Sequence, residues 1–495
     1  MLKFALTLTA IAAAAALTTG PAAAASDLCV GNKPGCFSTI QAAVDAAQDG
    51  DTIKVGPGTF AGGVTIDVSV QLVGAGAHAT IIKGGGPVLT IGRQLAPDPP
   101  TVSIQRVTIT GGDVSARGED TFAALGGGVF IEIAAAFGRG ATVTIADSVI
   151  TGNRAAPGET FPGGDFALAQ GGGIDNFGDL TLVNTQVTNN TAGSTPTMTS
   201  LATEANAGGI YNHIQAKLGL ERSLVRGNHA RVSSSHDGAA TSGGIFSLGE
   251  LTIRNSGISD NTAKLESSAP VTVDQVALAG GINVAFCPVE FCGPPHPTTI
   301  TNTVVRGNQA TTRNVNAEGF AGAFAGAIAA EGPLLLERSI VSDNIVRSVS
   351  AGDAAVDGGG LDVTGEVMIR DSLITHNRAV AEAVRAAYAV GGGIANGGRL
   401  TLERTLVVGN SLRATGAGGD LPFGVPSLVQ GGGIWNGDFD HGPPKLTLIR
   451  SAVLHNSLSA SPGFLVQGGG LYTDFPVSLT RTLIAGNKPD QCFGC

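Results

Sequence analysis

The stretch Gly391–Asn410, GGGIANGGRLTLERTLVVGN, contains the pattern that decides the fold of the chain. It opens on a glycine triplet followed by Ile394, and it closes on TLVVGN, a copy of the pattern S/T-x-I/V-x-x-N. Apolar residues in LTL and in T-x-V alternate with a period of two, which is typical of strands that bury one face. Gly clusters and Asn separate these short runs, as turn residues do.

Both signatures recur ten times along the chain. Successive signature asparagines are 31 to 47 residues apart, and the variation lies in Ala/Gly/Ser-rich inserts before the glycines. The asparagines are Asn153, Asn190, Asn228, Asn261, Asn308, Asn344, Asn377, Asn410, Asn456 and Asn487. The aliphatic residues that follow the glycines are Val129, Ile174, Ile210, Ile245, Ile282, Ile328, Leu361, Ile394, Ile434 and Leu471.

A repeat unit of this size cannot bury its apolar face alone, so neighbouring units must stack. Stacked coils place equivalent residues about 4.8 Å apart. The signature asparagine is therefore predicted to form a ladder in which side-chain amides hydrogen-bond from coil to coil. We also expect this asparagine to adopt the left-handed conformation of a coil corner, and the glycines to allow a sharp bend at another corner.

Composition agrees with one long solenoid. The chain has 495 residues, of which 74 are Gly and only 14% are charged, while 43% are hydrophobic. Disordered chains have low hydrophobicity and high net charge, and collagen has Gly at every third position, so both classes are excluded. The net charge of −10 with thinly spread Lys and Arg also makes nucleic acid an improbable partner.

The segment Ser38–Phe60, STIQAAVDAAQDGDTIKVGPGTF, resembles the start of the right-handed parallel β-helix, or pectin-lyase-like, superfamily. The resemblance implies an all-β, right-handed parallel β-helix solenoid with a short N-terminal capping helix. Ile40, Ala43, Val44 and Ala47 would face inward on that helix.

The later repeats resemble those of polymorphic outer-membrane proteins and related adhesins, with Val or Ile in place of the Phe of their F-x-x-N motif. This resemblance covers residues 38–487. It implies a fold and no single activity, because the scaffold carries many unrelated functions.

These features divide the chain into four segments. Residues 1–25 are predicted to be a signal peptide, with Lys3, an apolar stretch too short to span a bilayer, and an Ala run. The cap follows at 26–50, the β-helix at 51–487 with regular repeats from about 126, and a Cys-x-x-Cys tail at 488–495. We expect a secreted or cell-surface protein without a membrane span. An Arg excess over Lys and the many Ala and Gly suggest a bacterial source.

The six cysteines form three local pairs. In an exported protein this favours short-loop disulfides, with zinc as the alternative for the last pair. The pairs are Cys29 with Cys36, Cys287 with Cys292, and Cys492 with Cys495.

Known catalytic motifs of β-helix enzymes are absent from the sequence, including those of polygalacturonases, pectin esterases and alginate epimerases. One constellation is a candidate acid/base pair: Asp343 and His376 precede the ladder asparagine in adjacent coils, with Asp371 and Arg378 expected nearby. The alternative is that this corner is exposed and tolerant, since Gly occupies it in five coils.

Aromatic residues gather at the position directly after the G-G-G-I aliphatic. Because strand side chains alternate, this position is expected to face outward. Tyr211 and Phe246, and likewise Trp435 and Tyr472, would stack on adjacent coils and bind sugar rings. The alternative is that these ladders only stabilise the β-helix. The asparagines expected to donate hydrogen bonds to a ligand are Asn176, Asn212, Asn396 and Asn436.

The sequence therefore favours a non-catalytic binding or adhesion module for glycan or surface ligands, without cofactor or metal. The first alternative is a polysaccharide lyase or glycoside hydrolase with a non-standard site, and the second is a structural envelope spacer.

Overall fold

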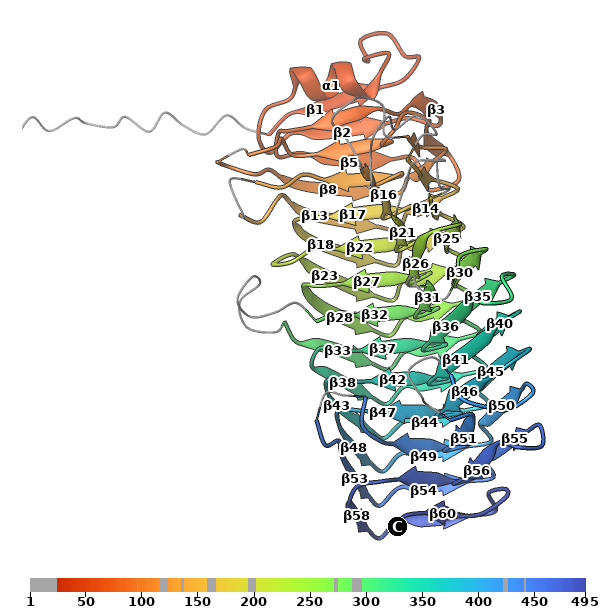
Figure 1. Ribbon diagram of the computed structural model, residues 1–495. Helices are drawn as coiled ribbons and strands as arrows, with labels where there is room; N and C mark the ends of the chain where they lie inside the picture. Colours follow the sequence, from red (N-terminus) through yellow and green to blue (C-terminus); the bar gives the residue numbers. More distant parts are fainter. Residues whose placement is uncertain are drawn as a thin grey trace, which may run out of the picture.

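The computed structural model describes residues 25–95, 97–115, 123–134, 138–157, 166–194, 202–270, 275–286, 296–421, 426–439 and 442–495 (Figure 1). The predicted signal sequence, apart from its last residue, and the pair Cys287 and Cys292 lie outside these described residues. The chain is a right-handed parallel β-helix, as the sequence predicted.

One coil from the middle of the solenoid contains five strands. They are β43 (Glu366–Arg370), β44 (Leu373–Thr375), β45 (Arg378–Ala383), β46 (Ala387–Val390) and β47 (Ile394–Asn396). Each pairs in parallel with the equivalent strand of the next coil, so a coil of this kind adds one strand to each of five sheets, whereas the first coils add strands to three of them only.

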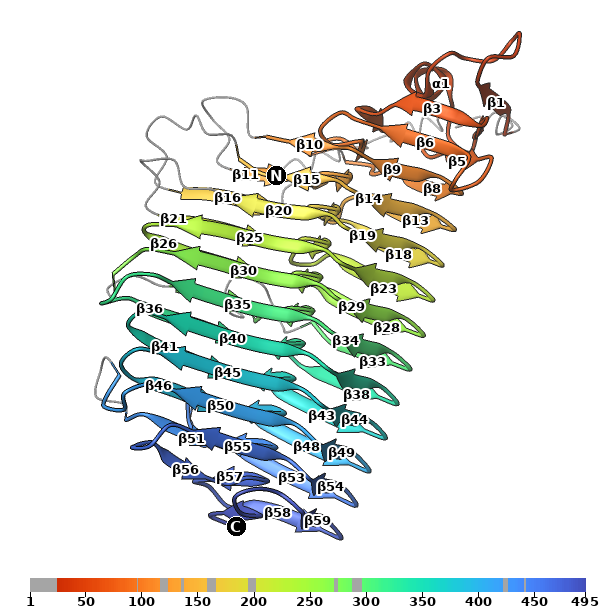
Figure 2. The ribbon, with the colours of Figure 1, turned by 90° about the vertical axis from the view of Figure 1, so that its right-hand side faces the viewer.

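We name the sheets A, B, D, E and C, after the order of β43 to β47 in the coil. Among the described residues, sheet A has 14 strands, from β1 (Asp27–Val30) to β58 (Val477–Thr480). Sheets B and C have 13 strands each, and sheets D and E have 10 each. Figure 2 shows sheets D and B side by side, with the strands of successive coils in order.

Two large hydrophobic cores run along the described part of the solenoid, beside smaller apolar clusters. Sheets A, B and C surround a core of Ile, Leu and Val. Sheets D and E pack against each other through a second core that is mostly alanine, including Ala379 and Ala381 of β45 with Ala387 and Ala389 of β46. Much of the Ala-rich inserts before the glycines therefore forms strands of sheets D and E. Small side chains let two sheets approach closely, so we call this pair of sheets the fin.

The N-terminal cap is confirmed. Helix α1 (Ile40–Ala46) begins after Thr39, whose hydroxyl accepts a hydrogen bond of 3.2 Å from the Ala42 N–H. This is a normal N-cap interaction. Ile40, Ala43 and Val44 are buried on the main core. Strand β1 lies before the helix and already pairs with β2 (Thr52–Val55).

The asparagine ladder is also confirmed. The side-chain nitrogen of Asn377 donates to the side-chain oxygen of Asn410 at 3.0 Å and to the Val341 carbonyl at 3.0 Å. All ten signature asparagines continue this pattern, and Gln491 ends it by accepting from Asn487. Each amide thus has two acceptors inside the core.

The corner conformation differs from the prediction. The left-handed backbone belongs to the residue before the ladder asparagine, for example Asp343 with φ 56° and His376 with φ 53°. Gly, Asn, Asp and His are the residues that tolerate this region best. The other residues at this corner are Gly152, Asn189, Gly227, Asp260, Gly307, Gly409, His455 and Gly486.

The glycine triplet and the ladder depend on each other. In the triplet at 358–360, Gly358 has φ 61°. A Cβ at Gly360 would lie 3.0 Å from the amide nitrogen of Asn377 and 2.8 Å from the Gly393 carbonyl oxygen. The missing side chain therefore makes room for the ladder. Ala327 occupies the third position in one coil, so this rule has an exception.

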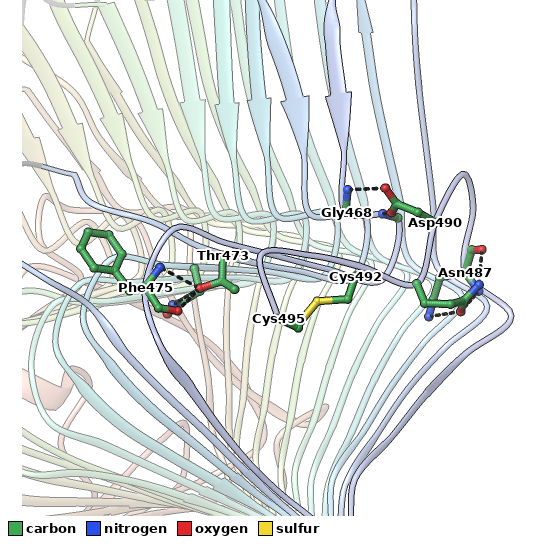
Figure 3. The surroundings of a disulfide bond; sticks show 10 residues. Gly468, Thr473, Phe475, Asn487, Asp490, Cys492 and Cys495 are labelled. Carbon is green, nitrogen blue, oxygen red and sulfur yellow. Dashed lines mark hydrogen bonds between the residues drawn. A yellow bond between two sulfur atoms is a disulfide. The ribbon is translucent and has the colours of Figure 1, made fainter.

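The C-terminal tail continues the solenoid. Strand β60 (Cys492–Phe493) pairs with β57 (Leu471–Thr473), and the Asp490 carboxylate accepts from the N–H groups of Gly468 and Gly469 (Figure 3). Disulfides join Cys492 to Cys495 and Cys29 to Cys36, as predicted.

Candidate functional site

The predicted acid/base pair is not assembled. The Asp343 carboxylate forms an ion pair of 3.0 Å with Arg306 of the preceding coil, and His376 Nδ1 lies 2.8 Å from the hydroxyl of its neighbour Thr375. In these described coils each side chain thus has another partner. The left-handed corner explains why Asp and His occur here, which supports the tolerant-corner alternative.

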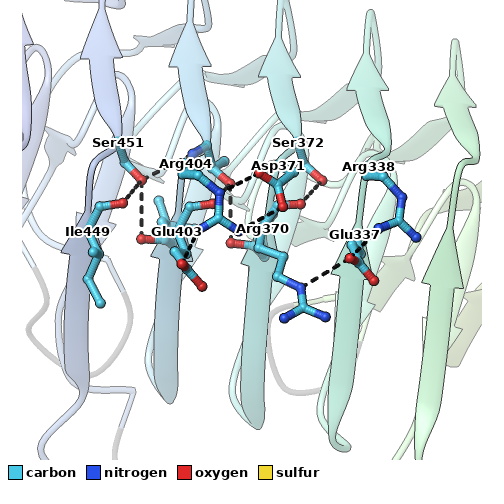
Figure 4. A network of polar contacts seen from close by, with 12 residues as sticks. Glu337, Arg338, Arg370, Asp371, Ser372, Glu403, Arg404, Ile449 and Ser451 are labelled. Carbon is cyan, nitrogen blue, oxygen red and sulfur yellow. Dashed lines mark hydrogen bonds and ion pairs between the residues drawn. The ribbon is translucent and has the colours of Figure 1, made fainter.

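Of the two charged residues expected beside this pair, Asp371 lies at a different corner, between sheets A and B, and Arg378 is the first residue of β45 in sheet D. Arg404 holds the Asp371 carboxylate with two hydrogen bonds, of 2.6 and 2.8 Å, and also contacts Glu403 (Figure 4). The bond from Arg404 lowers the pKa of Asp371. Arg370 pairs with Glu337 at 3.3 Å. Asp371 and Arg370 are at or near the surface, where such pairs add little stability.

The expectation that the aromatic ladder is exposed was wrong. Trp435, Tyr211 and Tyr472 are only 3%, 5% and 6% exposed, and Phe246 is partly buried. Tyr211 and Phe246 do stack as predicted, with ring centroids 4.8 Å apart and planes 7° apart.

The cause is the corner between sheets C and E, whose outward faces pack against each other. Trp435 of β52 (Ile434–Asn436) in sheet C clusters with Leu428 of β51 (Leu428–Gln430) in sheet E. Its indole N–H donates to the Gln430 side chain at 3.2 Å. Phe439 covers the indole, with ring centroids 4.4 Å apart. We call this region the C–E corner.

The four asparagines expected to meet a ligand are instead fully buried. They lie two residues after the aliphatic residue, and because side chains alternate along a strand they share its inward face. Asn176 donates to Asn212 at 2.8 Å and Asn396 donates to Asn436 at 2.7 Å, so they form a second internal ladder.

Two acidic clusters at the C–E corner were missed by the sequence analysis. In the first, His213 Nε2 lies 2.7 Å from an oxygen of the buried Asp175 carboxylate. The other oxygen has no hydrogen-bond partner among the described residues. The Phe177 ring stacks on the His213 imidazole, with the two ring centroids 3.4 Å apart. Burial raises the pKa of Glu132, and the Asp175 charge adds to this shift. The signals were His213 just after a repeat asparagine and Asp175 among otherwise apolar neighbours.

The second cluster contains Asp357 at the end of β41 (Asp353–Asp357) and Asp362 in β42 (Leu361–Val363). Burial raises the pKa of Asp362 to about 7, and the Glu331 charge adds to it. Burial, followed by the Asp362 charge, raises the pKa of Asp357 well above its usual value. Within the described part of the chain, one oxygen of each aspartate has no hydrogen-bond partner. Burial, followed by the Asp357 and Asp362 charges, also raises the pKa of Tyr388.

The outer face of sheet A carries a groove of about 480 Å³. It crosses β33 (Thr298–Thr301), β38 (Leu334–Glu337), β43, β48 (Arg399–Glu403) and β53 (Lys445–Ile449). Five residues at equivalent positions of neighbouring strands run along the centre of the groove, and three charged residues form one edge. The central row is Thr299, Leu335, Met368, Thr401 and Thr447, and the edge is Glu366, Arg399 and Lys445.

Two other site classes find no support. Within the described ranges, no group of three or more His, Cys, Asp and Glu side chains is arranged to hold a metal ion. In the part of the chain that the structure describes, no helix has the length and apolar character needed to cross a bilayer.

Comparison with known proteins finds a distant structural likeness. No protein-family model matches the sequence. No curated protein matches it either. Among solved structures, the chain is similar to the A-module of the mannuronan C-5 epimerase AlgE4 from Azotobacter vinelandii, with 11% identity and a TM-score of 0.36. The match covers 91% of this chain and 92% of that one. The fold assignment itself rests on the strand pairing described above.

Proposed function

We propose that the chain is an exported, non-catalytic binding protein that holds an extended polysaccharide in the sheet A groove. The carrying observation is the course of the groove across five strands. Equivalent positions recur about every 4.8 Å along the solenoid axis, so the groove is about 19 Å long from the first strand to the last. A polymer lying along that axis would meet a similar position in each coil.

The side chains of the groove suit a sugar polymer. Leu335 and Met368, of which Met368 is 41% exposed, offer an apolar floor for the C–H faces of sugar rings. Threonine hydroxyls extend the central row, and Arg399 and Lys445 along the edge can donate hydrogen bonds to ring substituents. An apolar surface with a few polar groups beside it is the usual composition of a ligand site.

Export is part of the same proposal. The predicted signal peptide at 1–25 and the disulfides at both ends of the described chain favour an oxidising compartment. Attachment to a glycan surface would then make the protein an adhesion or coating module.

A retention assay on immobilised polysaccharides tests this proposal. The variant Met368→Ala/Arg399→Ala removes one central and one edge side chain of the groove. The matched control Lys217→Ala/Thr252→Ala changes the equivalent register positions in coils outside it. We expect the groove variant to lose about tenfold in affinity with an unchanged Tm, because a few central side chains carry most binding energy. Equal retention of both variants would rule out the groove as the binding site.

A second candidate function is a polysaccharide lyase or glycoside hydrolase, which the Asp175–His213 contact favours. A buried carboxylate that orients an imidazole is a common arrangement for general acid/base chemistry. A turnover screen with His213→Ala tests it, with exposed His455→Ala as the control. Loss of turnover by a factor of about 100 in His213→Ala alone would establish catalysis. A protein that shows neither retention nor turnover would be a structural spacer.

A further inference from the structure

The outer face of sheet D in the fin concentrates positive charge. Its six central strands are β25 (His229–Ser234), β30 (Thr262–Ser267), β35 (Gln309–Asn314), β40 (Ile345–Ser350), β45 and β50 (Ser411–Thr415). Two acidic side chains, Glu266 and Glu382, accompany six exposed basic ones on these strands. We call this surface the basic face, and its basic residues are Arg231, Lys264, Arg313, Arg347, Arg378 and Arg413.

Strand register places four of these cations in one line along the solenoid axis, with Thr311 and Val380 at the two other positions of that row. Arg231 lies beside Lys264, and two coils later Arg347 is followed by Val380 and then Arg413. With strands about 4.8 Å apart, the row from Arg231 to Arg413 is about 24 Å long. Val380 faces outward between two arginines yet is only 2% exposed, as expected if the long side chains of its neighbours cover it.

Several of these cations converge on one point. Lys264 forms an ion pair of 2.8 Å with Glu266 and is the main cause of the lowered pKa of Glu266. Arg313 and Arg231 on the two adjacent strands lower the pKa of Glu266 further, so they too lie near this carboxylate. Arg347 pairs with Glu382 at 2.7 Å. The charges on this face therefore sum to about +4 in a chain whose net charge is −10.

A pocket of about 440 Å³ lies at the edge of the basic face, where β25, β30 and β35 end. Hydroxyl groups dominate its lining, and Arg313 and Glu266 belong to both the pocket and the basic face. The pocket is lined by Ser233, Ser234, Ser235, Glu266, Ser267, Ser268, Arg313 and Val315. Hydroxyl groups beside a guanidinium can bind an anionic oxygen group with charge-assisted hydrogen bonds.

We infer that the basic face and its serine-lined pocket form a binding site for a linear glycan that carries carboxylate or sulfate groups. This site lies on a different sheet from the groove of the proposed function and does not depend on it. Charges more than about 8 Å away are screened at physiological ionic strength, so the ligand meets the local positive charge and not the net negative charge. The row of Arg231, Lys264, Arg347 and Arg413 runs along one line, as the anionic groups of a linear polyanion do.

Binding of polygalacturonate, dextran sulfate and neutral dextran at low and high salt tests this inference. We expect at least one polyanion to bind, dextran not to bind, and the affinity to fall as salt rises. The variant Arg231→Gln/Arg347→Gln/Arg413→Gln should weaken binding about tenfold or more. Arg313→Gln should weaken it as well, and a preference between the two polyanions would identify the anionic group that the pocket accepts.

The control Arg254→Gln/Arg450→Gln/Arg481→Gln removes the same charge from exposed arginines at the corner between sheets A and B. Equal losses in both triple variants would overturn the inference, because nonspecific charge would then explain binding. It would also be overturned if neither polyanion bound, or if double-stranded DNA competed equally. Met368→Ala/Arg399→Ala should leave polyanion binding unchanged, so a failed sheet A groove is distinguishable from a failed basic face.

Discussion

The side-chain nitrogen of Asn344 donates a hydrogen bond of 2.9 Å to the side-chain oxygen of Asn377 on the next coil. The same oxygen accepts the backbone N–H of Asn344 at 3.1 Å. One buried acceptor therefore satisfies two buried donors of its neighbour, and this relationship repeats along the solenoid.

Asn377→Ala should destabilise the protein by about 3 kcal/mol, because it leaves two buried donors of Asn344 without an acceptor. Denaturant unfolding followed by circular dichroism measures this loss. Gln309→Ala, at an exposed position on sheet D, is the control and should be close to neutral. Equal stability of the two variants would show that the ladder is dispensable.

Gly360→Val should be strongly destabilising, because its side chain would meet the ladder amide and the carbonyl of the next coil. The control is Gly219→Val on the outer face of sheet A, where the nearest atoms to an added Cβ are 3.6 Å away. That change should be neutral or stabilising, since Val favours strands. The comparison of Tm values checks the prediction, and a control that unfolds earlier than Gly360→Val would refute it.

Trp435→Ala should lower the free energy of unfolding by about 3–5 kcal/mol, as expected for a large aromatic side chain in a packed cluster. Phe286→Ala, at a side chain that is 49% exposed, should cost far less. Thermal unfolding of the two variants measures this loss of stability independently of any loss of glycan binding. A Trp435→Ala protein with normal stability and lost glycan retention would instead support the interpretation that the aromatic residues bind sugar rings.

Asp362→Asn should stabilise the protein at neutral and alkaline pH. The folded carboxyl has a pKa of about 7 against 3.8 for the ordinary group, so it binds its proton more tightly when folded. Stability is therefore lost as pH rises from about 3.8 to about 7. The Asn variant lacks this loss, so its Tm should be higher by roughly 2–5 °C at pH 8 and equal near pH 4.

Exposed Asp420→Asn is the control for this pH series and should follow the parent protein throughout. An Asp362→Asn protein that gains stability only below pH 4, or loses it above pH 7, would contradict the assignment of a raised pKa.

The repeated elements could be predicted from the sequence because their cause is local and periodic. The Asn344–Asn377 contact follows from equivalent positions in stacked coils. The burial of Ile40, Ala43 and Val44 was instead implied by the resemblance of Ser38–Phe60 to the start of β-helix proteins. The fin could not be predicted from the sequence, because its Ala-rich segments look like loop inserts there. Only the packing of sheets D and E against each other across a narrow core identifies them as strands.

The candidate sites depended on contacts that spacing does not reveal. Alternation correctly placed Trp435 on the outer face of its strand, but the bend between sheets C and E then buried that face. Asp175 and His213 meet because two coils stack with one specific register, and their pattern matches no known motif. In the sequence, Asp343 and His376 resembled a catalytic acid/base pair. The left-handed backbone conformation at their position is enough to explain why Asp and His occur there.

The most direct test of the central claim is hydroxyl-radical footprinting of the protein with and without the polysaccharide that is retained best. Oxidation of Met368 and Leu335 in the sheet A groove, measured by peptide mass spectrometry, should fall several-fold on binding. Oxidation of Leu406 and Leu483, exposed on sheet B, should not change. Protection of the sheet B residues without protection of Met368 would contradict the account.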